Sequence, residues 1–174
     1  MSNPLGVPLE FQKERFWCWA AVAKGVADFY ANGDCGMAQC DIATRVLHIG
    51  DCCNGAACNR WSEMEEPLVV VQHTNGQPID CSEGTDGVFA VIQNAIKLQQ
   101  PIPARIQWSD GTGHFVVICG CSTNGQSSQS LQILDPWDSS TPVGDAPTIT
   151  TVPFDVFFAN YQGHGTCTTL YLTA

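Results

Sequence analysis

The chain has 174 residues, of which 44% are hydrophobic and 14% charged, so it is long enough to bury a core as a single domain over residues 1–174. Its formal net charge of -10 disfavours nucleic acid and membrane surfaces as partners, because both are anionic. No apolar run reaches the roughly 18 residues of a membrane-spanning helix, and the first residues lack the basic segment and apolar core of a signal peptide.

The first hundred residues are expected to be mainly helical. Apolar residues recur at helical spacing over three segments, 17–31, 37–48 and 86–100. Gly25 inside the first segment indicates close packing against another element. Ser62, with Glu65 three residues later, predicts the N-cap of a further helix. Residues 50–61 are expected to form a loop that their own cysteines hold.

Residues 101–174 are expected to be mainly β-strand. Short β-branched or alternating runs, separated by Gly, Asn, Ser and Pro, occur at 104–108, 114–121, 130–135, 148–152 and 166–172. Residues 138–147 predict a surface loop. Helices followed by strands favour an α+β fold, in which the helical half packs on an antiparallel sheet.

Ten cysteines are far more than a chain of this length usually carries, and five of them crowd between residues 35 and 58. A disulfide framework and a zinc site are the two explanations. The repeated CxxC spacing typical of zinc is missing, so disulfides are favoured and no metal or other cofactor is expected. Cys18 stands apart from the crowded segment. If it stays free, nine cysteines remain, and an odd number leaves at least one more unpaired.

The strongest chemical signal lies around Cys18, which opens the first predicted helix. The positive end of a helix dipole and its free N–H groups stabilise a thiolate, and a thiolate is a nucleophile. A carbonyl attacked there becomes an oxyanion that needs two donors. The Cys18 N–H is one candidate, and Gln12, six residues upstream, is the other.

Two strands supply candidates for the remaining roles. His114 follows a Gly-rich turn and begins a strand, a rigid place for a general base. Asp135 ends another strand and can fix the imidazole tautomer. Asn124 and Asn160 are alternative orienting residues, and His164 in Gln-Gly-His-Gly is an alternative base.

Each of these residues alone has an ordinary structural explanation. A cysteine in an apolar helix is usually a small packed hydrophobe, and an aspartate before proline is usually a turn former. The order Gln, Cys, His, Asp over helices and then strands favours catalysis. Trp137 is a candidate to shield the Asp–His bond or to pack in the core, and Trp19 is a candidate lining residue of the cleft.

With these motifs, Phe-Trp-Cys-Trp-Ala-Ala and Gly-His-Phe-Val, the chain resembles papain-like cysteine peptidases, especially the compact group of secreted bacterial effectors. It is also similar to bacteriocin leader-processing peptidases. The resemblance implies Cys18 as nucleophile, His114 as base, Asp135 as orienting residue and Gln12 in the oxyanion hole. Papain has Asn at the position of Asp135. The effector group commonly has Asp there, as this chain does.

The resemblance further implies a papain-like fold with its active site in the cleft between the two halves. It also implies a secreted or extracellular bacterial protein, expected to be a monomer, that hydrolyses peptide bonds of a polypeptide substrate through a thioester. Three alternatives stay open. One is a peptidoglycan amidase, endopeptidase or other thioester-forming acyl transferase. The others are a catalytically silent interaction module with the same fold, and an interaction domain stabilised by zinc.

Overall fold

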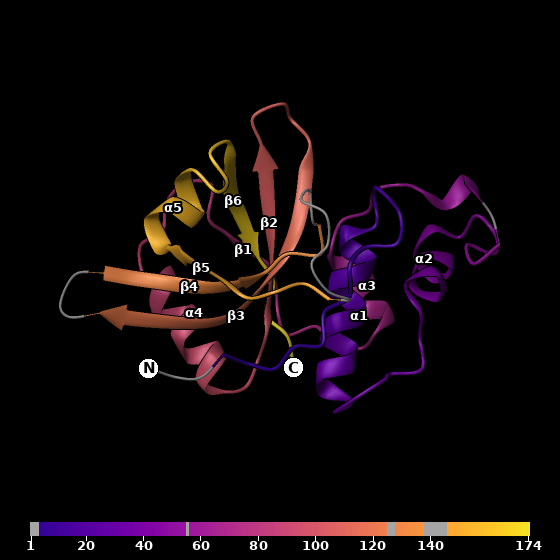
Figure 1. The fold of residues 1–174 in the computed structure, drawn as a ribbon, viewed down its shortest axis with the longest axis horizontal. Coiled ribbons are helices and arrows are strands. Elements are labelled where there is room, and N and C mark those ends of the chain that lie inside the picture. Colours follow the sequence, from indigo (N-terminus) through magenta and orange to yellow (C-terminus); the bar gives the residue numbers. More distant parts are fainter. Residues whose placement is uncertain (1–3, 55, 125–127, 138–145) are drawn as a thin grey trace.

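The computed structural model describes residues 4–54, 56–124, 128–137 and 146–174 (Figure 1). Its helices are α1 (Cys18–Tyr30), α2 (Gln39–Leu47), a short 3-10 turn (Ala56–Cys58), α3 (Glu65–Val70), α4 (Val88–Lys97) and α5 (Phe154–Ala159). Its strands are β1 (Ile79–Asp80), β2 (Ile102–Trp108), β3 (Gly113–Asn124), β4 (Ser128–Leu134), β5 (Thr150–Pro153) and β6 (Gly165–Leu170). Most of the expected surface loop over 138–147 lies outside the described residues.

The strands form one antiparallel sheet in the order β1-β6-β2-β3-β4-β5, with five of the six strands in the second half of the chain. The sheet and its helices confirm the predicted α+β class. Two elements were missed by the sequence analysis. β1 has two residues, too few to show an alternating pattern, and α5 has six, too few to show helical periodicity.

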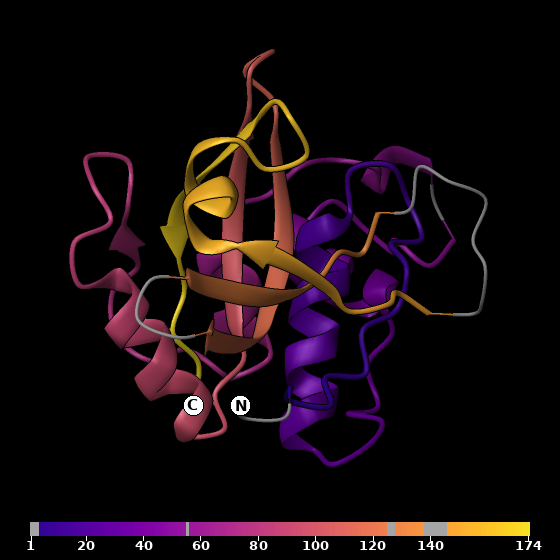
Figure 2. The same cartoon turned by 60° about the vertical axis from the view of Figure 1, so that its left-hand side comes forward.

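Helices cover the sheet from two sides. Figures 1 and 2 show α1, α2 and α3 on one side of β2 and β3, with α4 and α5 on the other. α1 packs against α2, α3 and β3, and every residue from Cys18 to Asp28 is buried. A Cβ at Gly25 would lie 2.9 Å from Leu9 Cδ1, which confirms the close packing expected there. Among the described residues, no helix is long and apolar enough to cross a membrane.

The predicted helix near Ser62 begins later than expected. α3 starts at Glu65, and the Ser62 hydroxyl donates to the carbonyl of Glu63 at 3.1 Å instead of capping the helix. With this start, Pro67 is the third residue of α3. Proline is tolerated in the first turn because the N–H groups there have no intrahelical acceptor. The predicted capping box at Ser62 was therefore wrong. The helix begins at Glu65, a start that places Pro67 in its first turn.

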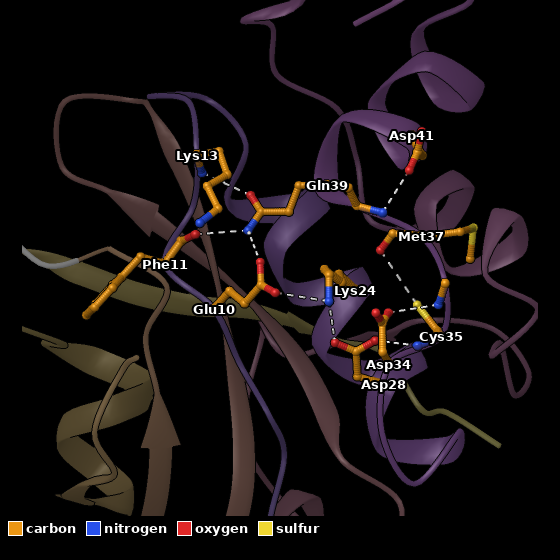
Figure 3. A network of polar contacts seen from close by, with 12 residues as sticks. Glu10, Phe11, Lys13, Lys24, Asp28, Asp34, Cys35, Met37, Gln39 and Asp41 are labelled. Atoms are coloured by element: carbon orange, nitrogen blue, oxygen red, sulfur yellow. Dashed lines mark hydrogen bonds and ion pairs between the residues drawn. The ribbon is translucent and has the colours of Figure 1, made fainter. Parts of the chain in front are cut away.

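A buried polar network ties the segment before α1 to α1 and α2 (Figure 3). Lys24, only 8% exposed, contacts Glu10 Oε1 at 3.1 Å and Asp28 Oδ2 at 2.5 Å. Burial alone would lower the pKa of Lys24, but its bonds to Asp28 and Glu10 raise it. The Gln39 side chain accepts from Lys13 N and donates to the carbonyl of Phe11, both at 2.9 Å. These contacts fix the backbone on both sides of Gln12.

Two disulfides hold the crowded cysteine segment, as the sequence favoured. Cys40 of α2 is bonded to Cys53, and Cys52 is bonded to Cys58. The loop over 50–61 is thus closed on itself and attached to α2. The other six cysteines, Cys18 among them, lie outside these two disulfides.

Candidate active site

Cys18 is the first residue of α1, where the backbone N–H groups lack intrahelical acceptors. Its side chain is buried, with 3% of the residue exposed. The residues around it are hydrogen-bonded to residues 58–60, where the loop closed by the Cys52–Cys58 disulfide ends. The three bonds are Trp17 Nε1 to Cys58 O at 2.7 Å, Trp19 Nε1 to Arg60 O at 3.1 Å and Phe16 N to Asn59 Oδ1 at 2.9 Å.

His114 is the second residue of β3, opposite Ile106 of β2, and is 7% exposed. Its Nε2 lies 2.7 Å from Asp135 Oδ1, which leaves Nδ1 as the nitrogen able to face Cys18. Burial alone would lower the pKa of His114. The charge and hydrogen bond of Asp135, together with the hydrogen bond and charge of Cys18, raise it instead to about 10. These two partners therefore favour the protonated form of the imidazole.

Asp135 directly follows β4 and is fixed by more than the imidazole. Its Oδ1 also accepts from Trp137 N at 2.9 Å. Its Oδ2 accepts from Tyr161 Oη at 3.0 Å and from Gln162 Nε2 at 3.3 Å. Four donors thus surround one carboxylate, which sets its position relative to His114. Asn160, the alternative orienting residue, is not one of these four donors.

Gln12 lies in the turn that leads into α1. Its Nε2 donates to the carbonyl oxygens of Glu14 at 2.9 Å and Arg15 at 2.6 Å. Its backbone N–H donates to the carbonyl of Pro136 at 3.0 Å, next to Asp135. Its Oε1 is buried without a hydrogen-bond partner among the described residues. The turn before α1 is thereby joined to the loop after β4, and the oxyanion role of Gln12 stays a prediction.

The two tryptophans singled out from the sequence have different positions. Trp137 is 47% exposed and lines the cleft beside Cys18. Trp19 has no exposed surface and packs in the core, so it does not line the cleft as expected. The reason is that its indole N–H is directed to the carbonyl of Arg60.

Trp108, at the end of β2, is the aromatic residue that covers the imidazole. Its ring is stacked on His114 at 5.9 Å, on Tyr161 at 6.1 Å and on His164 at 4.7 Å between centroids. A Cβ at Gly165 of β6 would lie 2.5 Å from this ring, so only glycine leaves room for it. Sequence reasoning missed Trp108 and Tyr161, although the Gly that begins β6 was a possible sign of a close approach.

The site opens into a cleft of about 730 Å³ between the helical half and the sheet, where it was expected. The N-terminal part contributes Arg15, Phe16 and Cys18 to its lining. The part that carries the sheet contributes His114 and Asp135. His164, the alternative base, also lines the cleft, but its Nδ1 lies 3.0 Å from the carbonyl of Gln162.

Two groups of described residues bring possible metal-ligand atoms within 4.8 Å of one another, and both lie outside the cleft lining. In the first, Asp41 lies beside Cys40 and Cys53, whose sulfurs are bonded to each other. The second comprises Asp28, Asp34 and Cys35. Asp28 is already engaged by Lys24 and by the Cys35 N–H.

Comparison with known proteins adds one finding about the family. The family described as papain-like cysteine protease AvrRpt2 matches residues 1–144, a span that includes Gln12, Cys18, His114 and Asp135. Among solved structures, the chain is similar to the Pseudomonas avirulence protein AvrPphB, with 9% identity over 91% of each chain and a TM-score of 0.42. That likeness is too low to carry an argument. No curated protein matches the chain.

Proposed function

Because the chain belongs to the family of papain-like cysteine protease AvrRpt2, we propose that it is a cysteine endopeptidase whose catalytic residues are Cys18, His114 and Asp135. One observation carries the proposal. The buried His114 imidazole contacts Asp135 through Nε2 and lies within hydrogen-bonding reach of the Cys18 sulfur. This is the geometry in which a thiolate and an imidazolium stabilise each other.

The first half of the reaction is acylation of the enzyme. The Cys18 thiolate attacks the scissile carbonyl carbon, a carbon–sulfur bond forms, and the carbonyl oxygen becomes an oxyanion. The Cys18 N–H at the start of α1 is the first proposed donor to this oxyanion. His114 then gives its proton to the amide nitrogen as the carbon–nitrogen bond breaks. The amine product leaves, and a thioester remains on Cys18.

The second half is hydrolysis of the thioester. Neutral His114 takes a proton from water, the water oxygen attacks the thioester carbon, and the carbon–sulfur bond breaks. The acid product leaves, and the Cys18 thiolate and the His114 imidazolium are restored. Asp135 keeps Nε2 protonated throughout, so that Nδ1 is the nitrogen that exchanges protons.

Gln12 is proposed as the second oxyanion donor. Its amide hydrogens now point to the carbonyls of Glu14 and Arg15. The role therefore requires one of them to turn toward the cleft when substrate binds. The backbone around Gln12 is already fixed by Gln39 and Pro136, so the proposed movement is a rotation of the side chain.

The proposed substrate is a polypeptide, and the proposed setting is a protein secreted by a bacterium. The test uses an unfolded, fluorescently labelled protein and purified peptidoglycan in parallel. Wild type is expected to cleave the unfolded protein, and Cys18→Ala and His114→Ala are expected to lose this cleavage. Mass spectrometry of a slowly turned-over ester should show an acyl group on Cys18. Release of peptidoglycan fragments alone, or cleavage that survives Cys18→Ala, would contradict the proposal.

A further inference from the structure

Arg105 brings a positive charge into the cleft that the proposed reaction does not use. It lies in the middle of β2, opposite Phe115 of β3, and lines the same cleft as Cys18. Its side chain is only 22% exposed. Long cationic side chains are seldom placed so far from water unless a partner holds their charge.

The hydrogen-bond donors of Arg105 are poorly used within the protein. A guanidinium has five N–H donors. Nε is buried without a hydrogen-bond partner among the described residues. Its nearest carboxylate is Glu63 Oε2, at 3.7 Å on a half-exposed side chain. Nη1 reaches Thr168 Oγ1 at 3.5 Å, the outer limit of a hydrogen bond. Unused buried donors are costly, so the guanidinium is suited to a further acceptor.

Two neighbours of Arg105 affect its guanidinium group. Gly113 lies near one of the nitrogens, and Trp61 lies against the plane of the group. A Cβ at Gly113, another residue of the cleft wall, would lie 3.4 Å from Nη2. The glycine therefore leaves that nitrogen less crowded than any other residue would. The Trp61 ring lies 5.8 Å from Cζ and is itself stacked on Phe115 at 6.4 Å. A cation over an aromatic face keeps its planar orientation.

The cleft is less acidic than the chain as a whole. The protein has 7 basic and 17 acidic residues. Apart from the three proposed catalytic residues and His164, the ionisable residues that line the cleft are Arg15, Arg105 and Asp110. Two of the seven cations thus line the cleft with this one carboxylate, and Glu63, outside the lining, lies 3.7 Å from Arg105 Nε. An anionic group on the substrate would find a complementary charge in this cleft.

We propose that Arg105 and Trp61 form a subsite that binds a carboxylate of the substrate. The proposal rests on the proposed peptidase function only in taking the ligand to be a polypeptide. Arg pairs with a carboxylate through two parallel N–H bonds, and Trp61 would pack against the aliphatic part of the same residue. The carboxylate can come from an Asp or Glu side chain or from the C-terminus of the substrate.

Binding tests the subsite independently of catalysis. Peptides blocked at both ends are titrated into Cys18→Ala protein, with a single Asp or Glu, or the neutral Asn or Gln, scanned through each position. At one position the acidic peptide is expected to bind roughly 10-fold more tightly than its neutral partner. A second arm compares the neutral peptide with a free and with an amidated C-terminus. A preference for the free acid there assigns the carboxylate to the C-terminus.

Matched variants identify Arg105 as the origin of the preference. In the Cys18→Ala background, Arg105→Gln is expected to bring the acidic-to-neutral affinity ratio to about 1, and Arg105→Lys to keep part of it. Arg45→Gln removes one exposed charge from α2, outside the cleft, and should leave the ratio unchanged. No preference in either arm, or a preference that survives in folded Arg105→Gln, overturns the subsite. Cleavage of the neutral peptide by wild type reports separately on the peptidase function.

Discussion

The phenol of Tyr161 donates a 3.0 Å hydrogen bond to Oδ2 of Asp135, the carboxylate whose Oδ1 contacts His114 at 2.7 Å. Tyr161 is buried, 3% exposed, and its ring is stacked on Trp108, which covers the imidazole. It lies beyond residues 1–144, the span that matches the family. The last part of this chain therefore completes the setting of the acidic residue.

Tyr161→Phe should lower kcat/KM of peptide hydrolysis by roughly 10-fold, because a hydrogen bond to a charged group is lost and Asp135 is less firmly placed. The loss should fall on kcat rather than KM, since Tyr161 acts through Asp135. The control is Tyr30→Phe, which removes a half-buried hydroxyl bonded to Thr173 at 2.8 Å, at the end of α1 opposite to Cys18. Equal losses of activity in the two variants would rule out a positioning role for Tyr161.

Asp135→Asn should move the alkaline limb of the pH–activity profile to lower pH. Activity requires His114 to be protonated, and the charge of Asp135 is a main reason that its pKa is raised to about 10. Without that charge, His114 loses its proton at a lower pH, and activity declines sooner as pH rises. We also expect kcat to fall by roughly 10-fold or more. An alkaline limb at the same pH in both proteins would show that Asp135 does not hold the proton on His114.

Lys24→Met should destabilise the protein by about 3–5 kcal/mol in urea unfolding, because Asp28 would remain buried without its cation. The Asp28 side chain is only 6% exposed. The double variant Lys24→Met with Asp28→Asn removes both charges and keeps an acceptor for Cys35 N. It should recover about half of that loss. A single variant that costs less than about 1 kcal/mol would mean that the network carries little stability.

The two disulfides should differ in what their removal changes. Cys52→Ser with Cys58→Ser frees the segment whose carbonyls hold Trp17 and Trp19 beside the nucleophile, so kcat/KM should fall roughly 10-fold. Removing the Cys40–Cys53 bond should mainly lower stability, by about 3 kcal/mol. Activity assays and urea unfolding of both double variants check this. If the two double variants lose the same activity, the Cys52–Cys58 disulfide has no special role in holding the residues around Cys18.

The residues with local signals could be predicted from the sequence. Helical spacing places Cys18 at a helix start, and a Gly-rich turn places His114 at the beginning of a strand. Asp135 is indicated by a strand that ends before proline. Each signal lies within a few residues of the side chain concerned. The contact between His114 and Asp135 then follows from the pairing of β3 with β4.

Residues whose position depends on the pairing of strands far apart in the sequence could not be predicted. Trp108 covers the imidazole because β2 pairs with β6, where Gly165 leaves space. Tyr161 follows α5, a helix too short to recognise from periodicity. Two tryptophans flank Cys18, and no local pattern shows that their indoles donate to the carbonyls of Cys58 and Arg60. The expectation for Trp19 failed for this reason.

The most direct test of the account is iodoacetamide labelling at pH 6, with peptide mapping of the six cysteines outside the two disulfides. Five of them lie in settings that raise their pKa: burial brings Cys81 and Cys119 to about 11, and it also raises the pKa of Cys35, Cys121 and Cys167. They should therefore label slowly. An ordinary thiol, with a pKa of about 8.5, is also almost fully protonated at this pH.

We predict that Cys18 labels at least about 10 times faster at pH 6 than an unperturbed model thiol, because protonated His114 stabilises its thiolate. His114→Ala should lower the labelling rate of Cys18 to that of the model thiol, while Arg45→Gln should not change it. If Cys18 labels no faster than the model thiol, or labels equally fast in His114→Ala, then Cys18 and His114 do not form the catalytic pair.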